Sequence, residues 1–428
     1  MEIIGIINWI IAIFFTVCYS YQMFYIAVSL AEKAPFLRWM FKKRHQKLTP
    51  TEIKKTRYGI LIAARNEEKV IGQLIDSIKA QDYPAELIDI FVMADNCTDS
   101  TKATAEAAGA IVYERFNKEL VGKGYALNLL LKNIARDFPE KHDAFLVFDA
   151  DNILEPNYIT EMNKTYSAGY EVATSYRNSK NYGDNWITAG YSLWFLREAS
   201  YLNHSRLLLN TSCAVSGTGF MFSRKIIEEC GGWNFYLLTE DIEFSIWNAA
   251  YGHKIGYCGT AMFYDEQPVT FRASWNQRLR WAKGYLQVFR YYGWRLLKGI
   301  FARGSFSCYD MSMNIMPATV LSFAAIILNI VALIMSIVTN QGLPGVLSSI
   351  GALVGSTYGL MFVIGGITTI TEWKNIHCSV PRKILAVFTF PIFMFTYIPI
   401  ALAALFKKVT WTPVEHSKAK DLKDIKKS

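Results

Sequence analysis

The stretch Ala144-Phe145-Leu146-Val147-Phe148-Asp149-Ala150-Asp151 is a run of five apolar residues followed by two acidic residues spaced by one position. A short uncharged run of this kind is typical of a buried strand in a parallel sheet. In open α/β sheets, ligands bind at the carboxyl ends of such strands. Solvated turn acids are the alternative interpretation. The position after a buried strand favours a site in which two carboxylates share a divalent cation and, through it, a diphosphate.

Strand and helix patterns alternate through the region that precedes this stretch. Strands are predicted at 58–64, 88–93 and 111–113. Helices are predicted at 67–80 and 124–134, and an Ala-rich helix that ends near residue 109 is predicted between the second and third strands. This alternation is typical of an α/β domain with a mostly parallel sheet covered by helices. Polar residues collect where the predicted strands end, and a binding site is expected there: Arg65, Asn66, Glu67, Asp95, Asp149 and Asp151.

Three long segments without any charged residue set this chain apart from a soluble domain. They cover residues 3–31, 311–371 and 384–406, in a chain of 428 residues that is 52% hydrophobic. A bilayer core needs roughly 20 apolar residues per helix. The segments therefore predict one membrane span, then a hairpin of two spans around residues 340–344, then one more.

Basic residues cluster directly after the first apolar segment: Lys33, Arg38, Lys42, Lys43, Arg44 and Lys47. By the positive-inside rule, the region that follows them is cytoplasmic and the protein is a multi-pass protein of the cell membrane. A full crossing by the last segment would place the Lys-rich tail outside. Because Pro391 and Pro399 interrupt that segment, a re-entrant or interfacial path is the alternative, and the number of C-terminal crossings stays open.

The formal net charge of +9 lies mainly beside the membrane segments. Attraction to anionic lipid explains that distribution better than nucleic-acid binding, so no nucleic-acid partner is expected. The seven cysteines are scattered without a Cys-x-x-Cys pair, so the sequence indicates neither a disulfide framework nor a zinc site.

Residues 277–307 mix aromatic and basic side chains in an amphipathic pattern. Aromatic rings and long cationic side chains favour the headgroup layer of a bilayer. We predict one or two helices that lie on the inner membrane surface, with a soluble core helix as the alternative.

Two further runs carry residues suited to chemistry. In Thr239-Glu240-Asp241, the acids can simply open a helix capped by Thr239; alternatively, Asp241 takes the proton of an acceptor hydroxyl. The run Gln277-Arg278-Leu279-Arg280-Trp281 supplies donors for pyrophosphate oxygens and a flat ring for a sugar or base. Outside this context it would be an interfacial basic stripe.

Taken in order, the three runs resemble those of the membrane-integrated family 2 glycosyltransferases, which include cellulose, chitin, hyaluronan and poly-N-acetylglucosamine synthases. The resemblance extends to Ala63-Ala64-Arg65-Asn66-Glu67-Glu68, to Val92-Met93-Ala94-Asp95-Asn96-Cys97-Thr98-Asp99 and to Gly122-Lys123-Gly124-Tyr125-Ala126-Leu127-Asn128. It implies a GT-A (Rossmann-like) glycosyltransferase domain inserted between transmembrane helices, with amphipathic interface helices beside it.

The resemblance also implies a role for each matching residue. Asp241 would be the general base with Glu240 beside it, and Asp151 would ligate Mg²⁺ or Mn²⁺. A UDP-sugar donor would be bound by Arg65, Glu67, Asp95, Lys123, Asp149, Gln277, Arg278, Arg280 and Trp281. The acceptor would meet Gly217, Thr218, Gly219 and Trp281.

The expected layout is a transmembrane helix at 1–33, a catalytic domain at 50–276, interface helices at 277–310, a membrane region at 311–406 and a basic tail at 407–428. The expected activity is processive and inverting transfer from a UDP-sugar to a growing β-linked polysaccharide. The alternative is transfer of one sugar to a lipid carrier or glycolipid. The gating run of cellulose synthases is absent, and Trp411-Thr412 in the tail resembles a shorter variant of it. The sugar, the linkage and any partner subunit cannot be read from the sequence.

Overall fold

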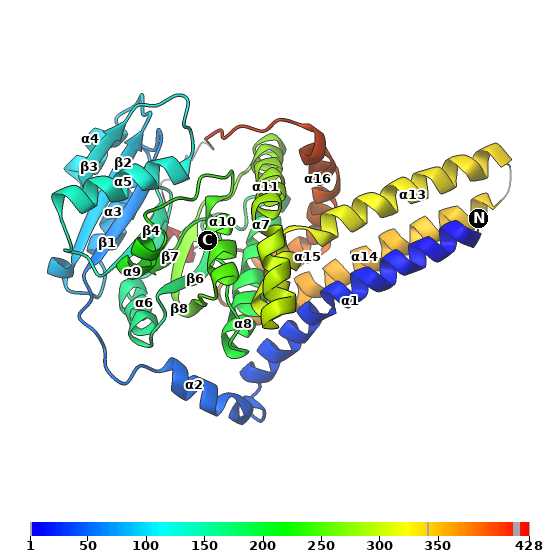
Figure 1. Cartoon of the computed structure of the whole chain (residues 1–428), viewed down its shortest axis with the longest axis horizontal. Coiled ribbons are helices and arrows are strands. Elements are labelled where there is room, and N and C mark those ends of the chain that lie inside the picture. Colours follow the sequence, from blue (N-terminus) through cyan, green and yellow to red (C-terminus); the bar gives the residue numbers. More distant parts are fainter. Residues whose placement is uncertain (1, 340–341, 414–419, 428) are drawn as a thin grey trace.

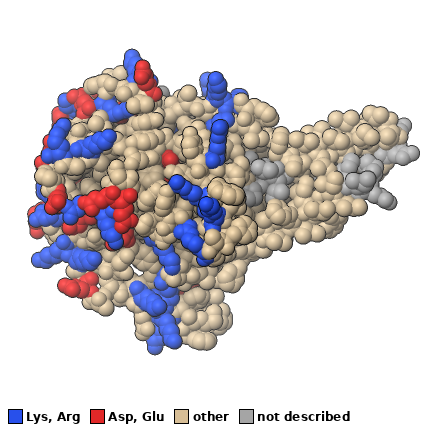
Figure 2. All heavy atoms as spheres, in the orientation of Figure 1, with Lys and Arg blue, Asp and Glu red and all other residues tan. Residues whose placement is uncertain are grey.

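The protein consists of an α/β domain and an elongated apolar projection (Figure 1). The computed structural model describes residues 2–339, 342–413 and 420–427. In Figure 2, charged side chains gather on the α/β domain, while the visible face of the described part of the projection carries none.

One mixed sheet of eight strands organises the α/β domain, in the order β3-β2-β1-β4-β7-β6-β8-β5. The strands β1, β2, β3 and β4 are parallel to one another, and β7 pairs antiparallel with both β4 and β6. The strand bounds are β1 Tyr58–Ala64, β2 Ile88–Asp95, β3 Ile111–Arg115, β4 Ala144–Asp149, β5 Ile153–Leu154, β6 Val172–Ser179, β7 Phe220–Ser223 and β8 Ile255–Asp265. All four strands predicted from the sequence are present.

The two faces of β1 belong to different parts of the core. Ile60 and Ile62 pack with Ile75, whereas Leu61 packs with Leu127 on the opposite face. This follows from the two-residue period of a strand, and burial of each such side chain contributes roughly 1.5–3 kcal/mol. The surrounding helices are α3 Ile71–Lys79, α4 Thr101–Ala107, α5 Lys123–Asp137, α6 Tyr158–Ser167, α7 Trp186–Arg197, α8 His204–Leu208, α9 Arg224–Glu229 and α10 Glu240–Tyr251.

The helix predicted from residue 67 begins four residues later, at Ile71. Asn66 adopts a left-handed conformation with φ of 59°. Its Oδ1 accepts a hydrogen bond of 2.8 Å from the Thr98 backbone N–H, and the Glu67 N–H donates to Thr101 Oγ1. These contacts tie the turn after β1 to the turn after β2 and delay the helix.

Two helices separate the sheet from the projection, α11 (Phe271–Arg303) and α12 (Phe306–Ile315). The predicted interface region began at residue 277, but α11 begins at Phe271 because Thr270 Oγ1 caps it by accepting from the Ala273 N–H. Gly304, with φ of 60°, ends α11 in the left-handed conformation.

The projection consists of α1 (Glu2–Lys33) and the hairpin of α13 (Pro317–Thr339) and α14 (Leu343–Thr371), which extend together away from the sheet (Figure 1). Three stretches among the described residues are long and apolar enough to cross a membrane: Trp9–Lys33, Leu343–Thr371 and Val380–Phe406. A shorter apolar stretch, Phe323–Thr339, lies in α13.

The last apolar segment is divided into α15 (Val380–Phe395) and α16 (Tyr397–Phe406), and Pro391 lies inside α15. Both helices lie beside α11, at the base of the projection formed by α1, α13 and α14 (Figure 1). The helix α15 packs against α7 and α14, and α16 packs against α11.

Candidate functional site

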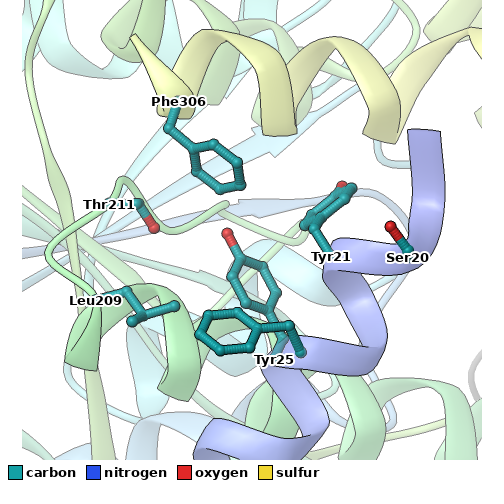
Figure 3. Close-up of a pocket in the computed structure, with 7 residues that line it drawn as sticks. Ser20, Tyr21, Tyr25, Leu209, Thr211 and Phe306 are labelled. Atoms are coloured by element: carbon teal, nitrogen blue, oxygen red, sulfur yellow. The ribbon is translucent and has the colours of Figure 1, made fainter. Parts of the chain in front are cut away.

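Two cavities differ sharply in their chemistry. The larger, about 410 Å³, lies between α1, α12 and the segment after α8. Figure 3 shows Tyr21, Tyr25 and Phe306 converging on it, together with Leu209 and Thr211. Its described lining contains no carboxylate or basic side chain, so this cavity is not the candidate site.

The second cavity, about 170 Å³, lies at the carboxyl ends of β1, β2 and β4, as the sequence predicted for a ligand site. Most of the predicted site residues line it: Arg65, Glu67, Asp95, Lys123, Asp149, Asp151, Gly217, Glu240, Asp241, Gln277, Arg280 and Trp281. Arg278, Thr218 and Gly219 do not.

The two acids after β4 have different partners. The Lys123 ammonium donates to Asp149 Oδ1 over 2.5 Å and to the Gly217 carbonyl over 2.8 Å. Asp151 is almost fully buried, and its Oδ2 accepts from the Glu266 N–H over 2.8 Å. Asp149 is thus joined to the Gly217 loop, whereas Asp151 is held against the end of β8.

Asp241 lies in the first turn of α10, where the helix N-terminus favours a negative charge. Its Oδ2 accepts a hydrogen bond of 2.6 Å from the Gly217 backbone N–H. Burial raises the pKa of Asp241 above its usual range, and the Gly217 and Ile242 amides and Lys123 act against that rise. Burial and the neighbouring Asp241 raise the pKa of Glu240 to about 7.

The residues from Gln277 to Trp281 lie on different faces of α11, and only one of these faces borders the cavity. Gln277, Arg280 and Trp281 stand at positions i, i+3 and i+4 of α11, which share one face, and all three line the cavity. Arg278 is rotated about 100° from Gln277 and is fully buried elsewhere. Its Nη1 donates to Thr396 Oγ1 over 2.6 Å, and its guanidinium lies 4.4 Å from the Phe393 ring centroid. The prediction that Arg278 binds the donor is therefore not supported, since Arg278 fastens α11 to the α15–α16 junction.

The loop from Gly217 to Gly219 is also divided: Gly217 lines the cavity, and the next two residues do not. Gly217 lines the cavity with φ of 77°. Thr218 is buried beneath it and accepts from the Asp149 N–H over 2.9 Å. A Cβ at Gly219 would lie 2.1 Å from the Phe263 ring, so this glycine permits close packing of the loop on β8. The structure thus places Thr218 and Gly219 under the acceptor loop, in place of the direct acceptor contact that was predicted.

The opposite end of the cavity contains the turn after β1 and the end of β2. Asp95 is buried in an ion pair of 2.6 Å with Arg115. Trp411 of the tail lies against two arginines of the cavity, 5.4 Å from the Arg65 guanidinium and 5.9 Å from that of Arg280, measured to the ring centroid. Trp411, Thr412 and Pro413 all line the cavity, so the tail lies on the same side of the apolar projection as the α/β domain.

Among the cavity residues that were missed in the sequence are Arg177, Asp265 and its neighbour Glu266, of which the first two form an ion pair. Arg177 and Asp265 end or nearly end β6 and β8, and Arg177 Nε donates to Asp265 Oδ2 over 2.7 Å. Burial raises the pKa of Asp265 to about 6, with Asp151 and Asp149 adding to the rise and Arg177 opposing it. The signal that could have found them is the strand-end rule, which was applied only as far as β4.

The residues that could hold a cation are these crowded carboxylates. Among the residues that the structure describes, no three His, Cys, Asp or Glu side chains form a ready metal cluster. Asp149, Asp151 and Asp265 nevertheless line one cavity, and their mutual repulsion contributes to the raised pKa of Asp265. Oxygen ligands of this kind suit Mg²⁺ or Mn²⁺ when a diphosphate supplies the remaining ligands.

A mixed α/β sheet with acidic and basic side chains around a cavity at its strand ends is the arrangement expected of a GT-A glycosyltransferase domain. The chain belongs to the glycosyltransferase-like family 2, whose model matches residues 56–284. The predicted family, fold class and enzyme class are confirmed.

Curated relatives include enzymes with different acceptors. The chain is 27% identical over 242 residues to the beta-monoglucosyldiacylglycerol synthase of Synechocystis sp., a match that covers 55% of this chain and 49% of that protein. It is 25% identical over 278 residues to the poly-beta-1,6-N-acetyl-D-glucosamine synthase of Staphylococcus epidermidis, with 62% of each covered. The chain thus spans about half to two thirds of the length of these relatives.

Among solved structures, a mannosyltransferase from Pyrobaculum calidifontis in complex with GDP-Man and Mn²⁺ is similar at 15% identity and a TM-score of 0.49. That match covers 90% of this chain and 99% of the other. The three stretches of the described residues that are long and apolar enough to cross a bilayer indicate a membrane protein.

Proposed function

We propose that this protein is an inverting, metal-dependent glycosyltransferase that uses a UDP-sugar to extend a β-linked glycan at the cytoplasmic face of the cell membrane. The observation that carries the proposal is the meeting of Asp149 and Asp151 with Asp241 and Arg280 in one cavity. Acids that suit a metal-bound diphosphate lie at its sheet end, and the half-buried carboxylate of Asp241, suited to deprotonating an acceptor, lies at the start of α10.

The donor would lie along the strand ends. Asp95 and the Arg65–Glu67 turn suit the uridine, and Lys123 and Arg280 suit phosphate oxygens. The Gln277 amide supports a sugar position: Gln277 lines the cavity, and its buried Oε1 has no hydrogen-bond partner among the described residues. A sugar hydroxyl that donates to this oxygen would remove the cost of leaving it unpaired.

A divalent cation fits the acidic end of this site. Asp151, with Asp149 and Asp265 nearby, would hold Mg²⁺ or Mn²⁺, which when bound neutralises charge on the departing diphosphate. The chain's own contribution is to fix these carboxylates: the Glu266 N–H orients Asp151, and Arg177 orients Asp265.

The transfer step follows from the position of Asp241. Asp241 takes the proton of the acceptor hydroxyl, the acceptor oxygen forms a bond to the anomeric carbon, and the bond from that carbon to the diphosphate oxygen breaks, with its electron pair leaving on UDP. Because attack and departure occur on opposite faces, an α-linked donor gives a β-linked product. Trp281, held edge-on by Tyr191 at 5.8 Å between ring centroids, offers a flat surface to the acceptor.

A second candidate is transfer of one sugar to a glycolipid or lipid carrier. The relatives named beta-monoglucosyldiacylglycerol synthase favour it, and poly-beta-1,6-N-acetyl-D-glucosamine synthases favour glycan extension. The same catalytic residues serve both reactions, which differ in whether the product stays bound at Trp281 for another cycle.

The decisive experiment is incubation of the purified protein in nanodiscs with single UDP-sugars, with Mn²⁺ or Mg²⁺, followed by mass spectrometry of the products. A homopolymer supports glycan extension. A single-sugar adduct on lipid overturns extension in favour of the second candidate. Absence of UDP release from every donor would reject both.

A further inference from the structure

Arg177 connects two regions of the cavity that the proposed reaction uses separately. Its Nε donates to Asp265 Oδ2 over 2.7 Å, and its Nη2 contacts the same oxygen. Its Nη1 donates to the Ser216 backbone carbonyl over 3.1 Å. One guanidinium therefore joins the end of β8 to the loop that precedes β7.

The Asp265 end of this connection lies beside the donor acids. Asp265 is 3% exposed, so its charge depends on a partner, and Arg177 is the cation bound to it. Asp149 and Asp151 both act electrostatically on Asp265. A change of charge at Asp149 or Asp151 therefore alters the electrostatic environment of Asp265, the carboxylate that Arg177 binds.

The Ser216 end of the connection leads directly to the proposed base. The next residue, Gly217, donates its N–H to Asp241 Oδ2 over 2.6 Å. A Cβ built on Gly217 would lie 3.8 Å from Arg177 Nη1 and 4.0 Å from Asp241 Oδ2, so the three groups converge. Moving the Ser216 carbonyl necessarily moves this N–H, because both belong to the same peptide unit.

We propose that Arg177 is a positioning residue that sets the orientation of Asp241 through the Ser216–Gly217 peptide while it anchors the donor-side carboxylate Asp265. This inference rests on the proposed function, since it takes Asp241 as the base. It assigns Arg177 no contact with the reacting atoms.

The local structure requires an arginine for this task. The Phe195 ring lies flat under the guanidinium, with 3.6 Å from its centroid to the Arg177 Cζ. A planar fork can bind Asp265 and the Ser216 carbonyl simultaneously while it stacks on a ring, whereas the ammonium of a lysine is a compact point charge. Arg177→Lys therefore keeps the positive charge but cannot bind Asp265 and the Ser216 carbonyl at the same time.

The loss should be visible in the protonation of Asp241. The Gly217 N–H lowers the pKa of Asp241, so displacement of the loop raises that pKa and moves the acidic limb of the kcat–pH profile to higher pH. The other charged or titratable groups that face Asp241 are Glu240 on α10, Lys123 on α5 and Tyr285 on α11. Arg177→Lys leaves all three unchanged.

The test compares the wild type, Arg177→Lys and Arg197→Lys in nanodiscs. Arg197 is a matched control, because it is also a buried arginine but binds Gln22 of α1. For Arg177→Lys we expect kcat to fall by about tenfold or more, the acidic limb to rise by about half a pH unit or more, and the Kd of UDP without added metal to change less than about threefold. Arg197→Lys should show none of these changes.

Hydrogen exchange supplies a readout independent of turnover. Peptides that contain Gly217 should exchange faster in Arg177→Lys, even if no donor is ever found for the wild type. Unchanged exchange together with an unchanged acidic limb would overturn the proposal. So would a loss of metal-free UDP affinity as large as the loss of kcat, since Arg177 would then bind the donor directly and not only through Asp265.

If Arg177→Lys fails to fold, Phe195→Leu removes the ring under the guanidinium and keeps the arginine. We expect a smaller shift of the acidic limb in the same direction and faster exchange at Gly217. Phe195 also touches Trp281, with 6.2 Å between ring centroids, and loss of that contact would alter the acceptor KM without moving the limb. An unmoved limb with unchanged exchange at Gly217 would overturn the proposal here too.

Discussion

The backbone N–H of Gly217 donates to the Asp241 carboxylate over 2.6 Å, and the carbonyl of the same residue accepts from Lys123 over 2.8 Å. Because Lys123 also holds Asp149, the loop residue Gly217 joins the proposed base to the donor side of the cavity. A residue without a side chain suits this position, since its φ of 77° lies in the left-handed region.

Asp241→Asn tests the base directly. The amide keeps the size of the side chain but cannot take the proton, so kcat should fall by about 10²- to 10⁴-fold. The Kd of UDP with Mn²⁺ should change less than about threefold, because the donor end is untouched. Calorimetry and UDP-release kinetics measure the two quantities. The exposed Glu106→Gln on α4 is the control, and equal losses of kcat and UDP affinity in Asp241→Asn would remove Asp241 from the base role.

The raised pKa of Glu240 has a consequence for stability. Its pKa is about 7 in the folded protein, against an ordinary value of 4.5. The folded state therefore holds an extra proton between those values, and the stability contributed by this group falls as pH rises through that window. Glu240→Gln stays neutral, so its apparent melting temperature should fall less than that of the wild type between about pH 5 and pH 8. Parallel melting curves for both proteins would contradict the assignment.

Asp151→Asn should change the metal requirement more than the donor specificity. The amide keeps an oxygen but loses the negative charge that favours a hard cation. The Mn²⁺ concentration for half-maximal activity should rise by more than about tenfold, while the ranking of UDP-sugars stays the same. Metal titrations with each donor measure this. Equal metal dependence in variant and wild type would show that Asp151 is no ligand.

The two arginines of the Gln277-to-Trp281 run should give opposite phenotypes. Arg280→Met removes a cavity cation, so the donor KM should rise by about tenfold or more, as for loss of a charged hydrogen bond. Arg278→Met leaves the Thr396 and Phe393 contacts unmade and should lower the melting temperature in detergent, with the donor KM changed less than about threefold. The pair shares chemistry and helix, so each variant is the control for the other. An equal rise of the donor KM in both variants would show that Arg278 does bind the donor.

The pattern of residues along the chain predicted the four strands from β1 to β4 and the site at their ends. The strands β1, β2, β3 and β4 were found because each is an apolar run followed by a turn, and their acids met because parallel strands end at one edge. Arg177 and Asp265 escaped because they depend on the pairing of β6 with β8, whose partners lie about 80 residues apart. No short motif records such a pairing.

Arg278 was misplaced for a different reason. The run from Gln277 to Trp281 was treated as one unit, although only positions three and four apart share a helix face. The sequence left two paths open for the tail, since the apolar segment at 384–406 is compatible with a crossing or with a fold back onto α7 and α11.

We expect the C-terminal tail to hold Trp411 in place against Arg65 at the donor end of the cavity. Beyond Trp411, the chain returns as α17 (Leu422–Lys427), where Ile425 is fully buried against Ile153 and Tyr264. Burying this side chain contributes roughly 1.5–3 kcal/mol, and a charge there would be costly. Ile425→Asp should therefore detach α17, loosen Trp411 from Arg65 and raise the donor KM by about threefold or more.

Lys423→Gln is the matched control, because it lowers the net charge of α17 by the same one unit at an exposed position. UDP-release kinetics over a range of donor concentrations distinguish the two variants. A donor KM that stays at the wild-type value in Ile425→Asp would mean that Trp411 keeps its place without α17. An equal rise in both variants would instead trace the effect to the lower net charge of α17.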